Sequence, residues 1–265
     1  MHGQVVDAVG LAIMGGDFSV DASLPNEDTL AAELAVSRTV VREAMKALAA
    51  KGMVQLRPRT GTRVLARANW NFLDPDVLRW HALTDQRSLI ENTVELRAIV
   101  EPAAAALAAA RATEHEVASL RLDFKAMQLA HTNGDTQAFN EVDASFHVRV
   151  IQMSHNPMIA ATAVPLRLGL TACFEFSSAP AGALVDAIPL HFRLVESIAN
   201  RQPQAAHDVL EQMLATSRHN ISRTDVEARS PGRSPAEASR TSGTAGALRP
   251  LPQFKHPNHV SKEKL

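Results

Sequence analysis

The sequence predicts a mainly α-helical protein in which a small N-terminal domain with a β-ribbon precedes a larger antiparallel helical bundle. Three observations predict this fold class. Residues 24–64 have the pattern of two short helices, a tight turn and a β-ribbon. Residues 88–223 have helical periodicity almost throughout. Residues 37–67 contain eight Lys or Arg and one acid, whereas residues 1–36 contain six acids and no Lys or Arg.

The first short helix begins at Asn26 or Glu27, and Leu30 and Leu34 give it an apolar face at i, i+4 spacing. Ser37 is a good N-cap for the second helix, because its hydroxyl can accept a hydrogen bond from a free backbone N–H of the first turn. Only a tight turn fits between the two helices.

The second helix has a basic side and an apolar stripe. Arg38, Thr39 and Arg42 lie in its first turns, on or near the side opposite the stripe, and Gly52 ends it as a C′ glycine would. The stripe consists of Val40, Val41, Ala44, Met45 and Leu48. In a helix-turn-helix, the first residues of the second helix reach base edges in the major groove, where the arginine fork matches guanine.

A basic hairpin follows, with strands at residues 53–56 and 62–65 around a turn at residues 57–61. Beside a recognition helix, such a hairpin is a wing whose tip touches phosphate or enters the minor groove. For one element alone, a solvated charged surface without function is the favoured interpretation. Helix, turn, basic helix and basic ribbon in this order, together with the charge division, indicate a DNA-binding module.

The rest of the chain divides into segments of different character. We expect a winged helix-turn-helix at residues 1–66, a connector at residues 67–84 with a short helix that starts at Asp74-Pro75, an all-helical domain at residues 85–223, and a disordered tail at residues 224–265. The predicted bundle helices are 88–111, 114–133, 135–154, 157–177, 183–200 and 203–222.

Composition narrows the class of protein further. One cysteine, Cys173, excludes an internal disulfide framework and indicates a reducing compartment, so we expect a cytoplasmic protein. No apolar run approaches the length of a membrane span, so no membrane partner is expected. Residues 68–223 contain 12 Lys or Arg against 17 Asp or Glu, which argues against a second nucleic-acid surface.

Two groups of side chains in the bundle are candidates for ligand binding. Asp143 and His147 stand at i, i+4 spacing on one helix face, where they can share one cation, and His191 is a third candidate. Arg97 lies among Leu and Ile positions. It is either an ion-pair partner of Glu101 at i+4 or a clamp for a carboxylate, since its planar fork binds carboxylates bidentately.

Residues 24–64 resemble the GntR family of winged-helix regulators. The family pattern LPxExxLAxxLxVSRxxVREAxxxLxxxGxV, followed by RxGxxV, is present at nearly every fixed position. The resemblance implies that Arg38 and Arg42 are the main groove and phosphate contacts and that Thr39 contacts phosphate. It places the wing tip at Arg59, Thr60 and Gly61. One position departs, because Asp28 stands where several relatives carry a basic residue.

The bundle is similar to the FCD effector domain of the FadR subfamily. Its patterns (V/A)DxxFHxxI and Hxx(L/I)xxAI correspond to VDASFHVRVI and HFRLVESI here. The resemblance implies a divalent ion, Zn²⁺ or similar, on Asp143, His147 and His191. Met213 stands where relatives have a fourth ligand, a histidine, and thioether is a poor ligand for such cations. We therefore expect a three-ligand site of lower affinity, or one without metal.

The resemblance also implies an effector. The segments NWNFLDPDVLRW, ELRAIVEP, AFNEVDASFH and SHNPMI look like those of regulators of galactonate and other sugar-acid catabolism. It places Arg97 at the effector cavity and implies a small carboxylate such as galactonate. The segment Phe174–Ser178 lacks the large aromatic side chain expected of a galactonate sensor, so another aldonate, a uronate-derived acid or a lactate-like acid stays open.

These expectations combine into a homodimeric repressor of sugar-acid or hydroxy-acid catabolism genes, released from its double-stranded DNA operator by a carboxylate. Two other classes stay open. One is a metal-dependent enzyme with a DNA-binding appendage, although no nucleophile with a partnered base stands out in the sequence. The other is an architectural DNA-binding protein whose bundle only dimerises.

Overall fold

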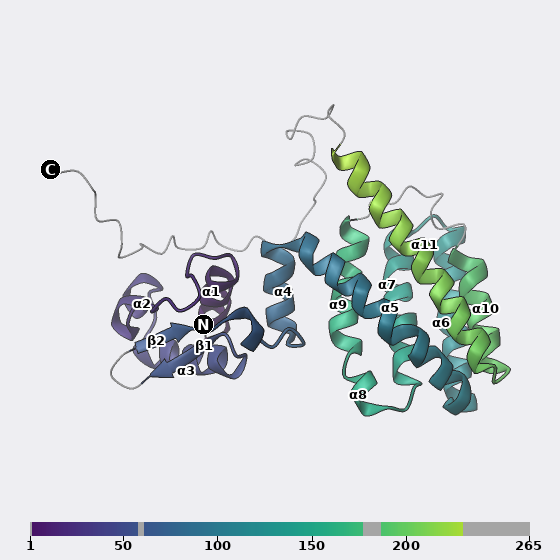
Figure 1. Cartoon of the computed structure of the whole chain (residues 1–265), viewed down its shortest axis with the longest axis horizontal. Helices are drawn as coiled ribbons and strands as arrows, with labels where there is room; N and C mark the ends of the chain where they lie inside the picture. The colour runs from purple at the N-terminus through teal and green to yellow at the C-terminus, as the bar shows by residue number, and fades with distance from the viewer. Residues whose placement is uncertain (1, 58–60, 177–186, 230–265) are drawn as a thin grey trace. The chain divides into compact units, whose positions relative to one another are not determined.

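The computed structural model describes residues 2–57, 61–176 and 187–229. The chain forms two compact units and passes from one to the other between Asn71 and Phe72. Both are built mainly from helices (Figure 1), which confirms the fold class.

In its described part, the N-terminal unit contains three α-helices, a two-stranded ribbon and a short 3-10 helix. α1 packs on α3, and α2 packs on the same helix. The ribbon is antiparallel, with Val54 opposite Val64, and each strand is displaced by one residue from its predicted position. The elements are α1 (His2–Met14), α2 (Glu27–Glu33), α3 (Arg38–Ala50), β1 (Val54–Arg57), β2 (Gly61–Val64) and η1 (Arg67–Asn69).

Local signals set the ends of these helices. The Asn26 side chain accepts a hydrogen bond from the backbone N–H of Thr29 at 2.8 Å, so α2 begins at Glu27 as expected. Ser37 caps α3 in the same way. Gly52 follows the last turn of α3 with φ of +73°, and a Cβ there would lie 2.0 Å from the carbonyl oxygen of Asn69. Only glycine satisfies both conditions.

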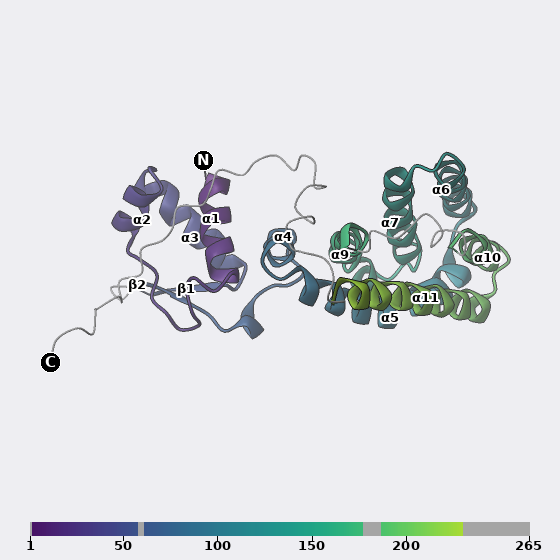
Figure 2. The ribbon, with the colours of Figure 1, turned by 90° about the horizontal axis from the view of Figure 1, so that it is seen from above.

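The C-terminal unit is a helical bundle in which α5 contacts α4, α7, α9, α10 and α11. α11 lies along α5 in both ribbon views (Figures 1 and 2). The expected connector helix is present as α4, and the Asp74 carboxylate caps it. The helices are α4 (Pro75–Thr84), α5 (Gln86–Arg111), α6 (Glu114–Thr132), α7 (Thr136–Gln152), α8 (Pro157–Ala160), α9 (Ala163–Phe176), α10 (Ala187–Ala199) and α11 (Pro203–Arg229).

Two expected helices differ in extent. The helix predicted at residues 157–177 is divided into α8 and α9. The backbone N–H and the hydroxyl of Thr162 both bond to the carbonyl of Ile159, at 3.0 and 2.7 Å, and this interrupts the helical ladder. The last helix continues to Arg229, beyond the expected end at residue 222. The rest of the expected tail, residues 230–265, lies outside the described residues.

The expectation that no apolar run approaches the length of a membrane span was wrong. The window Pro157–Phe174 is long and apolar enough to span a membrane by length and composition. It is interrupted between α8 and α9, and α9 contacts α4, α5 and α7. A core helix passes the same test, and the packing of α9 in the bundle accounts for the apolar sequence.

α9 approaches α5 closely where Gly169 faces Thr93. A Cβ at Gly169 would lie 2.2 Å from the Thr93 hydroxyl oxygen and 2.9 Å from its Cβ. Nearby, Cys173 packs in an apolar cluster with Leu78 and Leu89, which joins α4, α5 and α9. The close contact fixes the segment of α5 that carries Arg97, one turn further along the helix.

Candidate functional sites

The expected DNA-contact residues of α3 lie on its surface. Arg38, Thr39 and Arg42 are exposed, whereas Val41 on the same helix is fully buried against the unit's core. The amphipathic pattern therefore directs the three polar side chains outward, as a recognition helix requires.

Both arginines have acidic partners in the first turn of α2. Arg42 Nη2 donates to Glu27 Oε2 at 2.9 Å, and its Nε lies 3.2 Å from the same oxygen. The hydrogen bond from Arg42 lowers the pKa of Glu27 below its ordinary value. Arg38 Nε pairs with Asp28, the residue that departs from the family pattern. The basic face is thus partly neutralised from within the unit.

The wing is described only in part. Gly61 begins β2 with φ of +88°, a conformation that favours glycine, and is exposed. Arg59 and Thr60 lie outside the described residues. Arg63 is tied to the loop before α2, because its Nε donates to the backbone oxygen of Asp21 at 2.6 Å.

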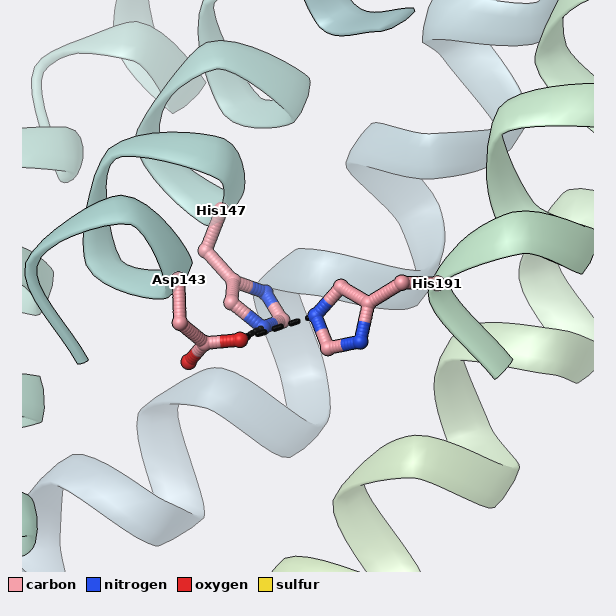
Figure 3. A group of neighbouring side chains, drawn as sticks. All are labelled: Asp143, His147 and His191. Atoms are coloured by element: carbon pink, nitrogen blue, oxygen red, sulfur yellow. Dashed lines mark ion pairs between the residues drawn. The ribbon is translucent and has the colours of Figure 1, made fainter. Parts of the chain in front are cut away.

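In the bundle, three helices bring five polar side chains together. α5 supplies Arg97 and Glu101, α7 supplies Asp143 and His147, and α10 supplies His191. All five side chains are less than a tenth exposed. The expected metal ligands Asp143, His147 and His191 face one another (Figure 3), and one ligand atom from each lies within 4.8 Å of the others.

The hydrogen-bonding surroundings of the histidines select the ring nitrogens that face the site. His191 Nδ1 lies 2.8 Å from the carbonyl oxygen of Ala187, which only accepts, so this nitrogen carries the proton. Nε2 is then left with its lone pair, 2.8 Å from Asp143 Oδ1. This contact is off the direction of a hydrogen bond, and the buried Nε2 has no hydrogen-bond partner.

His147 is arranged in a similar way. Its Nδ1 lies 2.7 Å from Glu101 Oε2, although this contact is also off the ideal direction of a hydrogen bond. Its Nε2 lies 3.8 Å from Asp143 Oδ1 and 3.4 Å from Arg97 Nη2. One carboxylate oxygen and two imidazole nitrogens thus converge, and this donor set fits a divalent cation.

Burial and charge pairing compete at the carboxylates. Burial alone would raise the pKa of Glu101, but the charge of Arg97 and the contact with His147 hold it at about 2. At Asp143 burial acts in the same direction, and the positive charge around it, including that of Arg97, holds its pKa at about 2. Arg97 Nε is 2.6 Å from Glu101 Oε1, so the expected i, i+4 ion pair is present. Both carboxylates are therefore ionised at neutral pH.

Comparisons with known proteins agree with both halves of this description. The profile of the bacterial regulatory proteins of the gntR family matches residues 2–64, and the FCD domain profile matches residues 92–216. The galactonate operon transcriptional repressor of Escherichia coli (strain K12) is 31% identical over 82% of this chain and 95% of its own length. The chain belongs to the GntR family.

A further relative is consistent with this membership, and a solved structure shares the fold. The uncharacterised HTH-type transcriptional regulator YieP of Escherichia coli (strain K12) is 33% identical over 76% of this chain and 87% of its own. The fold is shared with the solved structure of Lar from Listeria monocytogenes, with a TM-score of 0.56 at 19% identity, over 84% of this chain and 97% of that one.

Membership of the GntR family decides between the classes left open by the sequence. The matched families and relatives are DNA-binding transcription regulators, not enzymes. The expectation of a transcription regulator is confirmed, and the alternative of a metal-dependent enzyme is excluded. In a GntR regulator the buried polar group of the FCD domain is a candidate binding site for a small molecule and not a catalytic site.

Met213 does not complete the donor set. It is buried in the main hydrophobic cluster of the bundle, together with Phe146, Leu194 and Leu210. Within the part of the chain that the structure describes, the other group with metal-ligand spacing is His207, Asp208 and Glu211, whose two carboxylates are exposed. The buried group thus offers three ligand atoms.

One residue of the site has a second contact that the sequence did not indicate. Glu101 was considered only as the partner of Arg97, yet it also contacts His147 on another helix. The i, i+4 spacing from Arg97 showed that Glu101 lies on the same face of α5, but the contact between α5 and α7 is tertiary. In the segment Phe174–Ser178, the side chains after Phe174 lie outside the described residues.

Proposed function

We propose that this GntR regulator represses genes of sugar-acid or hydroxy-acid catabolism and leaves its operator when a small carboxylate binds beside a divalent cation in the bundle. The observation that supports the proposal best is the convergence of Asp143 Oδ1 with Nε2 of His147 and of His191. In each ring the proton is placed on Nδ1, which faces another oxygen. The buried lone pair of His191 Nε2 faces this carboxylate without a hydrogen bond, and a cation satisfies it best.

The buried charges indicate the class of effector. Arg97 contributes one positive charge, and Glu101 and Asp143 contribute one negative charge each, so the site without metal is negative by one. A divalent cation makes it positive by one, and a monocarboxylate then neutralises it. A dicarboxylate would leave an excess negative charge in a buried site, which is costly.

The name of one relative points to a sugar acid, and the name of another points to a neutral sugar. The relative from Escherichia coli represses a galactonate operon, and a relative from Paenarthrobacter nicotinovorans is a probable repressor of D-xylose utilisation. When bound, the cation supplies a positive centre with open positions for a carboxylate and a neighbouring hydroxyl. Arg97 covers another side of the same site. Galactonate, other aldonates and lactate are therefore the acids to test first.

For the DNA side, we propose a homodimer on a short pseudo-palindrome in the bacterial cytoplasm. One helix-turn-helix offers few base contacts, and two-fold symmetry doubles them. Arg38, Thr39 and Arg42 would read the groove and adjacent phosphates, with Arg59, Thr60 and Gly61 at the wing tip. Asp28, which stands where several relatives carry a basic residue, would orient Arg38.

The test measures operator release. A duplex selected by the wild-type protein from a random library is titrated by fluorescence anisotropy, with and without galactonate, xylonate, lactate and the dicarboxylate galactarate. Coupling of about 1–3 kcal/mol would weaken binding 5- to 150-fold with one of the monocarboxylates. Asp143→Asn should keep the operator affinity and remove the response. The exposed His115→Ala on α6 is the control and should respond as wild type.

Metal content separates the parts of this proposal. Mass spectrometry of the purified protein should find a near-stoichiometric divalent ion that Asp143→Asn lacks. Release by a monocarboxylate from metal-free protein would contradict the role of the cation. Stronger release by galactarate than by any monocarboxylate would contradict the charge argument, and no release by any acid would contradict the proposed effector class.

A further inference from the structure

Glu101 lies where the candidate metal ligands and the candidate effector residue meet. Its Oε1 is 2.6 Å from Arg97 Nε, and its Oε2 is 2.7 Å from His147 Nδ1. The side chain is 1% exposed, so it has no access to bulk water. We infer that Glu101 is a positioning residue that fixes the proton of His147 on Nδ1 and links this ligand to Arg97. The inference rests on the cation site proposed above.

The first step concerns the two tautomers of His147. A neutral imidazole carries its proton on one nitrogen, and the neighbour of each nitrogen selects which one. The ionised carboxylate of Glu101 only accepts, so it favours the proton on Nδ1. Nε2 then presents its lone pair toward Asp143 and His191. A carboxylate behind a ligating histidine is the usual means of fixing ring orientation and raising basicity.

The second step concerns Arg97. Its Nη2 lies 3.4 Å from His147 Nε2, the nitrogen expected to bind a cation, and 3.5 Å from Glu101 Oε2. A guanidinium only donates, so in this arrangement it occupies the lone pair of His147. A cation on that nitrogen must displace Nη2, whereas the contact of Nε with Glu101 can stay. Glu101 would thus keep its contact with Nε, and the displaced Nη2 would become available to an anion.

The two steps have a joint consequence. The same carboxylate determines where His147 presents its lone pair and where Arg97 is held. Cation binding and anion binding are then coupled through one side chain on α5. A purely structural role, in which Glu101 only neutralises the buried Arg97, would not require the contact with His147.

The first measurement is independent of metal. In chelator-treated protein labelled with ¹⁵N-histidine, two-bond ¹⁵N–¹H correlation spectra report the tautomer of each ring. The His147 signals, identified by their loss in His147→Ala, should show the proton on Nδ1 in wild type. In Glu101→Gln, whose amide also donates, they should show a mixture or the other tautomer. Arg97→Met/Glu101→Gln also lacks the Arg97 donor at Nε2, and an unchanged Nδ1–H signal in this variant would overturn the inference.

The second measurement is Co²⁺ affinity, by competition with a chromogenic chelator. Loss of a group behind a metal ligand typically weakens metal binding about 10- to 100-fold, which is the loss expected for Glu101→Gln. Glu95→Gln, an exposed glutamate on the same helix, should bind as wild type. Since Glu101→Gln leaves Arg97 buried without its partner, Arg97→Met/Glu101→Gln is measured as well. It keeps no buried charge on α5 and should show the same weakening.

The outcomes distinguish the two proposals. If wild type binds Co²⁺, Asp143→Asn does not, and both Glu101 variants stay within twofold of wild type, the inference fails while the cation site stands. If wild type binds no better than Asp143→Asn, the cation site itself is wrong, and the inference fails with it.

Discussion

Arg97 and Glu101 form an ion pair in which neither side chain is more than 5% exposed. Burial acts against the charge of each one. It lowers the pKa of Arg97 and raises that of Glu101, and the partner reverses both effects. Such a pair adds little net stability over an apolar pair of similar shape, but loss of one partner leaves a charge buried alone.

A double-mutant cycle should show this asymmetry. Arg97→Met alone should lower the free energy of unfolding by about 3–5 kcal/mol, because the Glu101 charge loses its partner. Arg97→Met/Glu101→Gln should be closer to wild type than either single variant. Urea denaturation followed by circular dichroism measures all four proteins. Additive single effects would contradict the pairing.

The thiol of Cys173 should react slowly in the native protein. Burial raises its pKa to about 11, with Glu101 adding to the shift and Arg97 opposing it. At pH 8 a thiol with this pKa has about 100-fold less thiolate than one near the ordinary value of 9. Its reaction with a disulfide reagent should therefore accelerate with pH well beyond pH 9. The same protein in guanidinium chloride is the control, and equal rates in the two states would refute the expectation.

At the scale of elements, the contact between α5 and α9 depends on the absence of a side chain at Gly169. Gly169→Ala would place a methyl group against Thr93, and the helices would have to separate. We expect a loss of about 1–3 kcal/mol of stability, as for other overpacked cores. Thermal unfolding measures it, with Gly3→Ala in α1 as the control, because nothing lies within 4 Å of a Cβ there. Equal stability of Gly169→Ala and wild type would show that α5 and α9 separate without a loss of stability.

The sequence predicted these elements where the signals are local. Asn26, Ser37 and Asp74 cap helices within three residues of themselves, so their roles follow from the order of residues alone. The break before α9 was missed because it depends on two bonds, from the backbone N–H and the hydroxyl of Thr162 to the carbonyl of Ile159. A β-branched residue inside an apolar run does not reveal these bonds.

The same distinction holds for the site. Asp143 and His147 share a helix face by spacing, whereas His191 was a third candidate on another helix, and the family resemblance strengthened its place in the site. The second contact of Glu101 was not expected at all, since it needs the packing of α5 against α7. The ion pairs of Arg38 and Arg42 were missed for a related reason. Acids and bases were counted in separate segments, although α2 and α3 bring them together.

At the scale of the whole molecule, the two units should carry separable functions. Arg42→Ala removes a charge from the exposed face of α3 and leaves the bundle untouched. We expect it to abolish specific operator binding in the anisotropy titration and to keep wild-type Co²⁺ affinity and dimer mass. Arg87→Ala, exposed on α5, should keep both activities. Operator binding by Arg42→Ala at the wild-type level would overturn the assignment of the recognition helix.

The acids of α2 have a consequence for how the protein responds to ionic strength. DNA affinity falls with added electrolyte in proportion to the number of phosphate charges that a protein neutralises on balance. Asp28 and Glu27 already neutralise part of the charge of Arg38 and Arg42. Each of these arginines therefore adds less to that number than an unpaired arginine. The protein should bind DNA of random sequence weakly, and its affinity for an operator should depend more on contacts with the bases. Its occupancy of an operator would then change less when the osmotic state of the cell changes.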